Sequence, residues 1–194
     1  MSIEKTLSVK KREGLGKGSN RRLRVEGLVP GVFYAADGKN IAVQSETLPL
    51  EKIYAEMSTT GVFNLEIEGE GTFPAMFWQV QKHPYKRQFS HIDFFGVDLE
   101  KEIKVKVPVE FVGTSKGVKL GGRLETYREV LLLKAKPMDM PQKITVDISD
   151  MGINTTIMVS DIVLPANVSA VYDRSFAMVS VLSKDKSLEE GEPK

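Results

Sequence analysis

Hydrophobic and polar residues alternate along much of the first 95 residues, and a period of two is typical of β-strands with one buried face. The alternation begins between Ile3 and Lys11 and returns in GVFYAADGKNIAVQ, where DGKN predicts the tight turn of a β-hairpin. It continues in VFNLEIEGEGTFPAMFWQVQ, which bends at GEG, and in FSHIDFFGV. We assign the side chains of Phe73, Phe77 and Trp78 to the core. The pattern predicts a small antiparallel β-barrel over residues 1–95.

Two stretches within this region follow a helical pattern instead. Ser19 or Asn20 is a suitable N-cap for a helix that runs to Glu26, with Leu23 facing the core and Gly27 as the left-handed residue after the helix. A second helix is expected from Pro49 to Met57 with Thr47 as its cap, because its apolar residues recur at helical spacing: Leu50, Ile53, Tyr54 and Met57. The N-terminal domain should therefore carry two short helices on its β-barrel.

From residue 96 onward the chain consists of short β-like runs separated by Gly, Pro, Asn and Asp, without a convincing long helix. This pattern predicts an all-β C-terminal domain over residues 96–183, either a sandwich or a barrel. The basic, glycine-rich KGVKLGGR is expected to be a loop that contacts a partner. Residues 184–194 have little to bury and are expected to be a disordered tail.

The composition describes an ordinary globular protein and excludes several kinds of chemistry. The 194 residues are 41% hydrophobic and 27% charged, with a net charge of +1. The chain has no cysteine, so disulfides, Cys-ligated zinc and thiol catalysis are excluded. The N-terminus lacks the apolar segment of a signal peptide, and we expect a cytoplasmic protein.

Positive charge is concentrated in one segment, from Lys10 to Arg24. It contains seven Lys or Arg residues against one acidic residue, Glu13. Its glycines suggest a phosphate-binding loop, but Lys11 stands where the first glycine of that motif should be and Gly18 replaces its Ser or Thr. Two interpretations remain: a solvated helix face, or a surface that binds phosphates of a nucleic acid. RNA is favoured over DNA because the sequence offers neither a long recognition helix nor a zinc module.

A second polar group lies in SHIDF, where His91 and Asp93 should share one face of a strand while Ile92 and Phe94 face the core. The pair could act in acid–base catalysis, for example in a hydrolase acting on an RNA-linked ester. However, the sequence has no serine or cysteine nucleophile in a recognisable nucleophile-elbow motif. With two histidines in the chain, a metal site lacks ligands, and we expect neither metal nor cofactor. The remaining interpretations are a surface hydrogen-bonded pair and a polar pair that faces RNA.

Two motifs together carry a family resemblance. GKGSNRRLRVEGLVPGVFY, taken with VQKHPYKRQFSHIDF about sixty residues later, resembles the bacterial large-subunit ribosomal protein L25 family in its two-domain form, the general stress protein CTC. The resemblance extends through IKVKVPVEFVG, GVKLGG and VSDIVLP. The chain differs from some members at Asn20, where they have a small residue or Ser, and at Leu15, which lengthens the loop before Gly16 relative to the shortest members.

The resemblance implies a non-catalytic structural protein whose N-terminal barrel binds an irregular internal loop of 5S rRNA near the central protuberance of the large subunit. The C-terminal domain would contact neighbouring ribosomal proteins or 23S rRNA. A stress-associated ribosome binder that is not a stoichiometric subunit is the alternative. Carried over by position, the RNA contacts would come from nine residues: Lys11, Lys17, Asn20, Arg21, Arg22, Arg24, Tyr34, His91 and Asp93.

Overall fold

The computed structural model describes residues 5–35, 38–86 and 88–183, and the expected tail at residues 184–194 lies outside them. The chain divides into two compact units. One contains the residues up to Lys106 and Lys134–Gln142, and the other contains Val107–Leu133 and the described residues from Lys143 onward. Within the described residues, no helix has the length and apolar character needed to cross a membrane.

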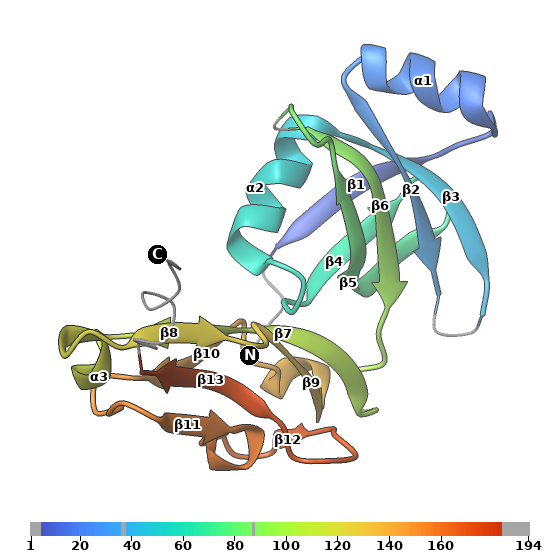
Figure 1. Ribbon diagram of the computed structural model, residues 1–194. Coiled ribbons are helices and arrows are strands. Elements are labelled where there is room, and N and C mark those ends of the chain that lie inside the picture. The colour runs from blue at the N-terminus through green and yellow to red at the C-terminus, as the bar shows by residue number, and fades with distance from the viewer. Residues whose placement is uncertain (1–4, 36–37, 87, 184–194) are drawn as a thin grey trace, which may run out of the picture. The chain divides into compact units, whose positions relative to one another are not determined.

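The first unit is built on a closed six-stranded barrel, as the sequence predicts (Figure 1). The strands follow one another around the barrel in the order β1, β3, β2, β6, β5, β4. Four neighbouring pairs are antiparallel, but β1 runs parallel to β4 and β2 runs parallel to β6. The strand bounds are β1 Thr6–Lys11, β2 Leu28–Tyr34, β3 Asn40–Glu46, β4 Phe63–Ile67, β5 Gly71–Lys82 and β6 Phe89–Gly96.

The first helix, α1 (Lys17–Val25), begins earlier than the sequence indicates. Its N-cap is Gly16, at φ +96°, and no side chain caps it, so the assignment of Ser19 or Asn20 as N-cap is wrong. Asn20 is inside the helix, where its backbone N–H donates to the carbonyl of Gly16. Gly27 adopts φ +79°, which confirms the left-handed residue after the helix.

The second helix, α2 (Thr47–Met57), contributes Leu50 and Ile53 to the core of the barrel. Thr47 is its first residue rather than its cap, and its hydroxyl donates a 2.6 Å hydrogen bond to the carbonyl of Gly27. This bond ties the start of α2 to the turn that follows α1.

The barrel core is rich in phenylalanine, and it confirms Phe77 as a buried residue, with Phe73 packed against the core. Trp78 is different: its exposed fraction is 56%, so its assignment to the core is wrong. Because Phe77 faces the core, strand alternation turns its neighbour Trp78 outward. Trp78 is also the extra residue at an irregularity in the pairing of β5 with β6, where Phe77 lies opposite Phe94 but Gln79 lies opposite Asp93.

The rest of the chain forms two sheets, with strand orders β10-β7-β9-β12 and β11-β13-β8. Phe111 of the first sheet packs with Leu124 and Val179 of the second in one hydrophobic cluster, as expected for a β-rich C-terminal domain.

KGVKLGGR is not wholly a loop, because Lys116–Lys119 forms a one-turn helix, α3, capped by Ser115. The bounds are β7 Ile103–Val112, β8 Arg123–Thr126, β9 Val130–Ala135, β10 Ile144–Asp147, β11 Thr155–Met158, β12 Ser169–Ala170 and β13 Ala177–Leu182, with 3-10 turns at Pro137–Asp139 and Val159–Asp161.

Candidate nucleic-acid interface

Side-chain hydrogen bonds join helix α1 to the rest of the N-terminal unit. None of its residues is fully buried, and Leu23 is half-buried. Arg24 donates from Nε to the carbonyl of Ser90 on β6 at 2.9 Å. Arg12, just after β1, donates from Nη1 to Oδ1 of Asn20. These two bonds fix the helix against the ends of β1 and β6, beside which it lies outside the barrel (Figure 1).

Three basic residues of α1 expose their side chains to solvent: Lys17, Arg21 and Arg22. Over residues 5–35, 38–86 and 88–183, these side chains have no hydrogen bond or ion pair to the protein. Arg22 and Arg24 lie in the last turn, where the helix dipole favours cations, and the first turn has no acidic residue. The helix thus exposes several cations that few acidic groups of the protein neutralise.

His91 and Asp93 lie side by side on the outer face of β6. Nδ1 of His91 is 3.2 Å from Oδ1 of Asp93, and their side chains are 23% and 15% exposed. Ile92 and Phe94, the alternate residues, are buried in the core, as the strand pattern predicts. Because Arg24 is bonded to Ser90, α1 and the polar face of β6 form one continuous surface.

Two buried polar atoms of this surface lack a hydrogen-bond partner among the described residues: Oδ1 of Asp93 and Nε of Arg12. The approach of His91 to Asp93 is close, but it does not have the geometry of a hydrogen bond. Buried polar groups in folded proteins nearly always have partners, so an unused acceptor and an unused donor need an explanation. A ligand that brings both N–H donors and acceptor oxygens would satisfy the two atoms.

The charges of this surface act on one another. Burial lowers the pKa of His91 below its usual value; Asp93 opposes this shift, whereas Arg12 and Arg24 add to it. Burial also lowers the pKa of Arg12, and the positive charge of Arg24 adds to that effect. Like charges are therefore held close together, an arrangement that an anion would stabilise.

Lys11 and Tyr34 have surroundings that differ from those of the arginines of α1. Nζ of Lys11 is 2.8 Å from Oε1 of Glu70, and Nζ of Lys39 is 2.8 Å from Oε2 of the same carboxylate. Hydrogen bonds from the two ammonium groups lower the pKa of Glu70 to about 2. Tyr34 is half-buried at the end of β2, opposite Phe95 of β6. Lys11 is thus engaged with a carboxylate, whereas Tyr34 shares the sheet that carries Asp93.

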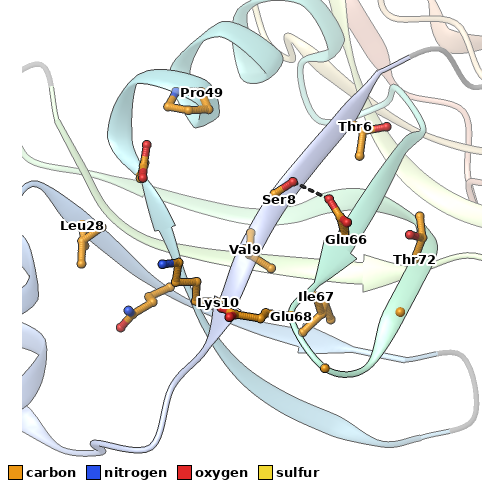
Figure 2. A pocket seen from close by; sticks show the side chains of 14 residues that line it. Thr6, Ser8, Val9, Lys10, Leu28, Pro49, Glu66, Ile67, Glu68 and Thr72 are labelled. Atoms are coloured by element: carbon orange, nitrogen blue, oxygen red, sulfur yellow. Dashed lines mark hydrogen bonds between the residues drawn. The ribbon is translucent and has the colours of Figure 1, made fainter.

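A different face of the barrel, around β1, is hollowed into an open groove of about 850 Å³ (Figure 2). Lys10 lies there among the carboxylates of Glu46, Glu66 and Glu68, and Glu66 accepts a hydrogen bond from Ser8. Acidic side chains outnumber basic ones in the lining, so this groove repels phosphates. The surface around α1 and β6 has the opposite charge.

Arg12 is the residue that sequence reasoning left out of the candidate site. Its segment is rich in basic residues, and nothing in the local pattern distinguishes Arg12 from Lys10 or Lys11. The distinction comes from the fold, which half-buries Arg12 between the strand and Asn20. No sequence signal indicates that contact.

Comparison with known families gives two consecutive matches. Residues 7–94 match the sequence profile described as the ribosomal L25p family, and residues 102–185 match the C-terminal domain of ribosomal protein TL5. The first match contains α1 as well as His91 and Asp93 of β6.

Three proteins that match this chain over nearly their full length share the description "Large ribosomal subunit protein bL25". The relative from Desulfovibrio desulfuricans is 64% identical over 189 residues, which are 96% of this chain and 95% of that protein. The relative from Nitratidesulfovibrio vulgaris strain Miyazaki F is 57% identical over 94% of this chain and 97% of its own. A more distant relative, from Desulfotalea psychrophila, is 37% identical over 93% of this chain.

Proposed function

Because this chain belongs to the ribosomal L25p family, we propose that it is a structural component of the large ribosomal subunit that binds 5S rRNA near the central protuberance. The binding surface consists of α1, Arg12 and the outer face of β6. As a member of a ribosomal protein family the chain is a structural protein and not an enzyme, which overturns the hydrolase alternative suggested by His91 and Asp93.

The observation that carries the proposal is the pair of unsatisfied buried atoms, Oδ1 of Asp93 and Nε of Arg12, beside exposed arginines. A carboxylate acceptor suits the amino and imino N–H groups of bases, and a guanidinium donor suits phosphate, O6 or N7. RNA presents both kinds of partner within a few ångströms. A simple anion would satisfy Arg12 but would be repelled by Asp93.

The parts of the surface have different tasks. Arg21, Arg22 and Lys17 are exposed and contact phosphates, which sets the affinity and its dependence on salt. Arg12, His91 and Asp93 are more enclosed and contact base edges, which fixes the register on one RNA shape. Tyr34 borders the base-reading part.

Binding of a 5S rRNA transcript by the full chain tests the proposal, with a transfer RNA as the control. At a fixed salt concentration we expect 5S rRNA to bind at least ten-fold more tightly than the control. Equal affinities would mean that the arginines bind any RNA and do not distinguish 5S rRNA, and the proposal would then fail.

A second experiment separates an integral subunit protein from a loosely bound stress factor. Large subunits that contain the chain are washed at increasing salt and sedimented. We expect the chain to stay with the subunit until 5S rRNA itself is released. Release at modest salt, with 5S rRNA retained, would support the alternative.

The C-terminal domain is proposed to contact 23S rRNA or neighbouring ribosomal proteins. We also propose that the N-terminal domain ends near residue 95 and the C-terminal domain near residue 183. All buried residues of the barrel's hydrophobic cluster lie between Leu7 and Phe94, which supports an N-terminal domain that ends near residue 95.

A further inference from the structure

Trp78 is an exposed aromatic residue in an unusual position. It is the single tryptophan of the chain, and 56% of it is exposed. It occupies the irregular step of β5, between Phe77 and Gln79, at which the register with β6 shifts. Bulges of this kind are frequent next to functional sites. The fold thus turns outward a large apolar ring whose neighbour Phe77 is buried.

The Trp78 ring is part of a row of three aromatic side chains on adjacent strands. Its centroid is 5.2 Å from that of Phe95, and the two planes are inclined by 41°. Phe95 in turn lies opposite Tyr34 in the parallel pairing of β6 with β2. We call Trp78, Phe95 and Tyr34 the aromatic row. Its rings come from β5, β6 and β2, so the barrel sheet holds them in fixed relative positions.

The aromatic row continues the polar surface of β6. Phe95 lies two residues after Asp93 and therefore on the same face, about 7 Å along the strand. Gln79, the residue after Trp78, is paired directly opposite Asp93. Along one face of the sheet, the order is thus His91, Asp93 and then the aromatic row.

We propose that the aromatic row stacks an unpaired base of the RNA whose neighbouring nucleotides contact Asp93 and the arginines. This inference rests on the proposed function. Aromatic side chains beside basic ones are the usual means of holding unstacked bases, because every base has a π face. Trp78 supplies the largest accessible ring, and Phe95 fixes its orientation.

Charge favours RNA over a protein as the occupant. The cations Arg12 and Arg24 lie close enough to His91 to lower its pKa, so the surface next to the aromatic row attracts a polyanion. The carboxylates of the acidic groove come from β3, from β4 and from the residue that follows β4: Glu46, Glu66 and Glu68. An apolar protein segment would gain from the three rings but not from the adjacent guanidinium groups.

The lone tryptophan makes the test direct, because all indole fluorescence of the chain comes from Trp78. The full chain is titrated with a 5S rRNA transcript at low salt, while binding is followed independently by gel mobility. We expect the emission of Trp78 to be quenched in parallel with complex formation. RNA binding with unchanged emission would overturn the aromatic row as a base-binding site, while leaving the proposed function intact.

Variants supply the second readout. We expect Trp78→Ala to weaken 5S rRNA binding about five-fold or more, the loss that corresponds to one base stack, without changing the salt dependence. Trp78→Phe should retain most of the affinity. Tyr127→Ala, at an exposed tyrosine of the C-terminal half, is the matched control and should bind normally.

The outcomes distinguish the two proposals. Wild-type affinity of Trp78→Ala for 5S rRNA would contradict stacking. A weaker dependence of its affinity on salt would also contradict stacking, because it indicates a lost phosphate contact. If Trp78 is quenched by proteins of the large subunit but not by 5S rRNA, the row is a protein-docking surface and the inference is wrong. If the wild-type chain does not bind 5S rRNA at all, both proposals fail.

Discussion

Arg12 and Asn20 are joined by a hydrogen bond from Nη1 of the guanidinium to Oδ1 of the amide. The bond connects the residue that follows β1 to the helix that carries the exposed arginines. It also leaves Nε of Arg12 buried and unused. The position of Arg12, and with it the proposed base-reading part of the surface, therefore depends on a side chain of α1.

Replacing Asn20 with Ala removes the acceptor for Arg12. We expect the free energy of unfolding to fall by about 1–2 kcal/mol, because the guanidinium loses a partner in a half-buried place. Binding to 5S rRNA should weaken as well, since Arg12 and α1 lose their relative position. Urea unfolding and a binding titration measure the two effects.

Asn20→Asp is the informative companion of that variant. It keeps an oxygen acceptor for Arg12 and should preserve stability, but it adds a negative charge to the proposed interface. We expect wild-type stability with weakened RNA binding. Tight binding by Asn20→Asp would show that RNA does not approach this end of the helix.

Replacing Arg22 with Ala tests the phosphate contacts. The side chain is exposed and has no partner among the described residues, so stability should change by less than about 0.5 kcal/mol. We expect the plot of log K against log salt for 5S rRNA to become shallower by about 0.7–0.9. Lys119→Ala, an exposed cation of α3, is the control. An unchanged slope for Arg22→Ala would mean that this part of α1 faces solvent in the complex.

His91 should make the stability of the free protein depend on pH. Its folded-state pKa is lowered, chiefly by burial, so below about pH 6.5 the unfolded chain binds a proton that the folded chain resists. The contribution to stability is therefore complete above that pH and is lost as pH falls toward and through the folded-state pKa. Urea unfolding between pH 8 and pH 5 should show a steeper loss for the wild type than for His91→Asn. Parallel curves would contradict the lowered pKa.

Glu70 decides whether Lys11 is available to RNA. With a pKa of about 2, the carboxylate is ionised at every pH used for RNA binding, and it holds the ammonium group of Lys11. Glu70→Gln should release Lys11 and steepen the salt slope for 5S rRNA by up to about 0.9. Glu68→Gln makes the same charge change two residues away and is the control. Equal slopes for the two variants would remove Lys11 from the interface.

The sequence predicted the parts of the fold that are encoded locally. Alternation and the DGKN turn predicted β2 and β3, and the spacing of Leu50 and Ile53 predicted α2. The closure of the barrel was not predictable in this way. The parallel pairs β1–β4 and β2–β6 join segments far apart in the chain, and alternation does not say which strand is the neighbour.

The same limit applies to the candidate site. A period of two placed His91 and Asp93 on one face, and the density of arginines indicated α1, because both signals are local. The engagement of Lys11 by Glu70, 59 residues away, has no local signal. Trp78 was assigned to the core with Phe73 and Phe77 as a large apolar residue, although alternation from Phe77 places it on the opposite face of the strand. The register shift after Phe77, which sets the facing of Gln79, has no local signal.

The most direct test of the central claim is the identity of the RNA that the chain retains. The full chain and a fragment of residues 1–95 are each purified from cells at moderate salt, and the bound RNA is sequenced. We predict that 5S rRNA is the dominant species in both, and that it is depleted when Arg21 and Arg22 are replaced together by Ala. Retention of other RNAs without enrichment of 5S rRNA would contradict the account.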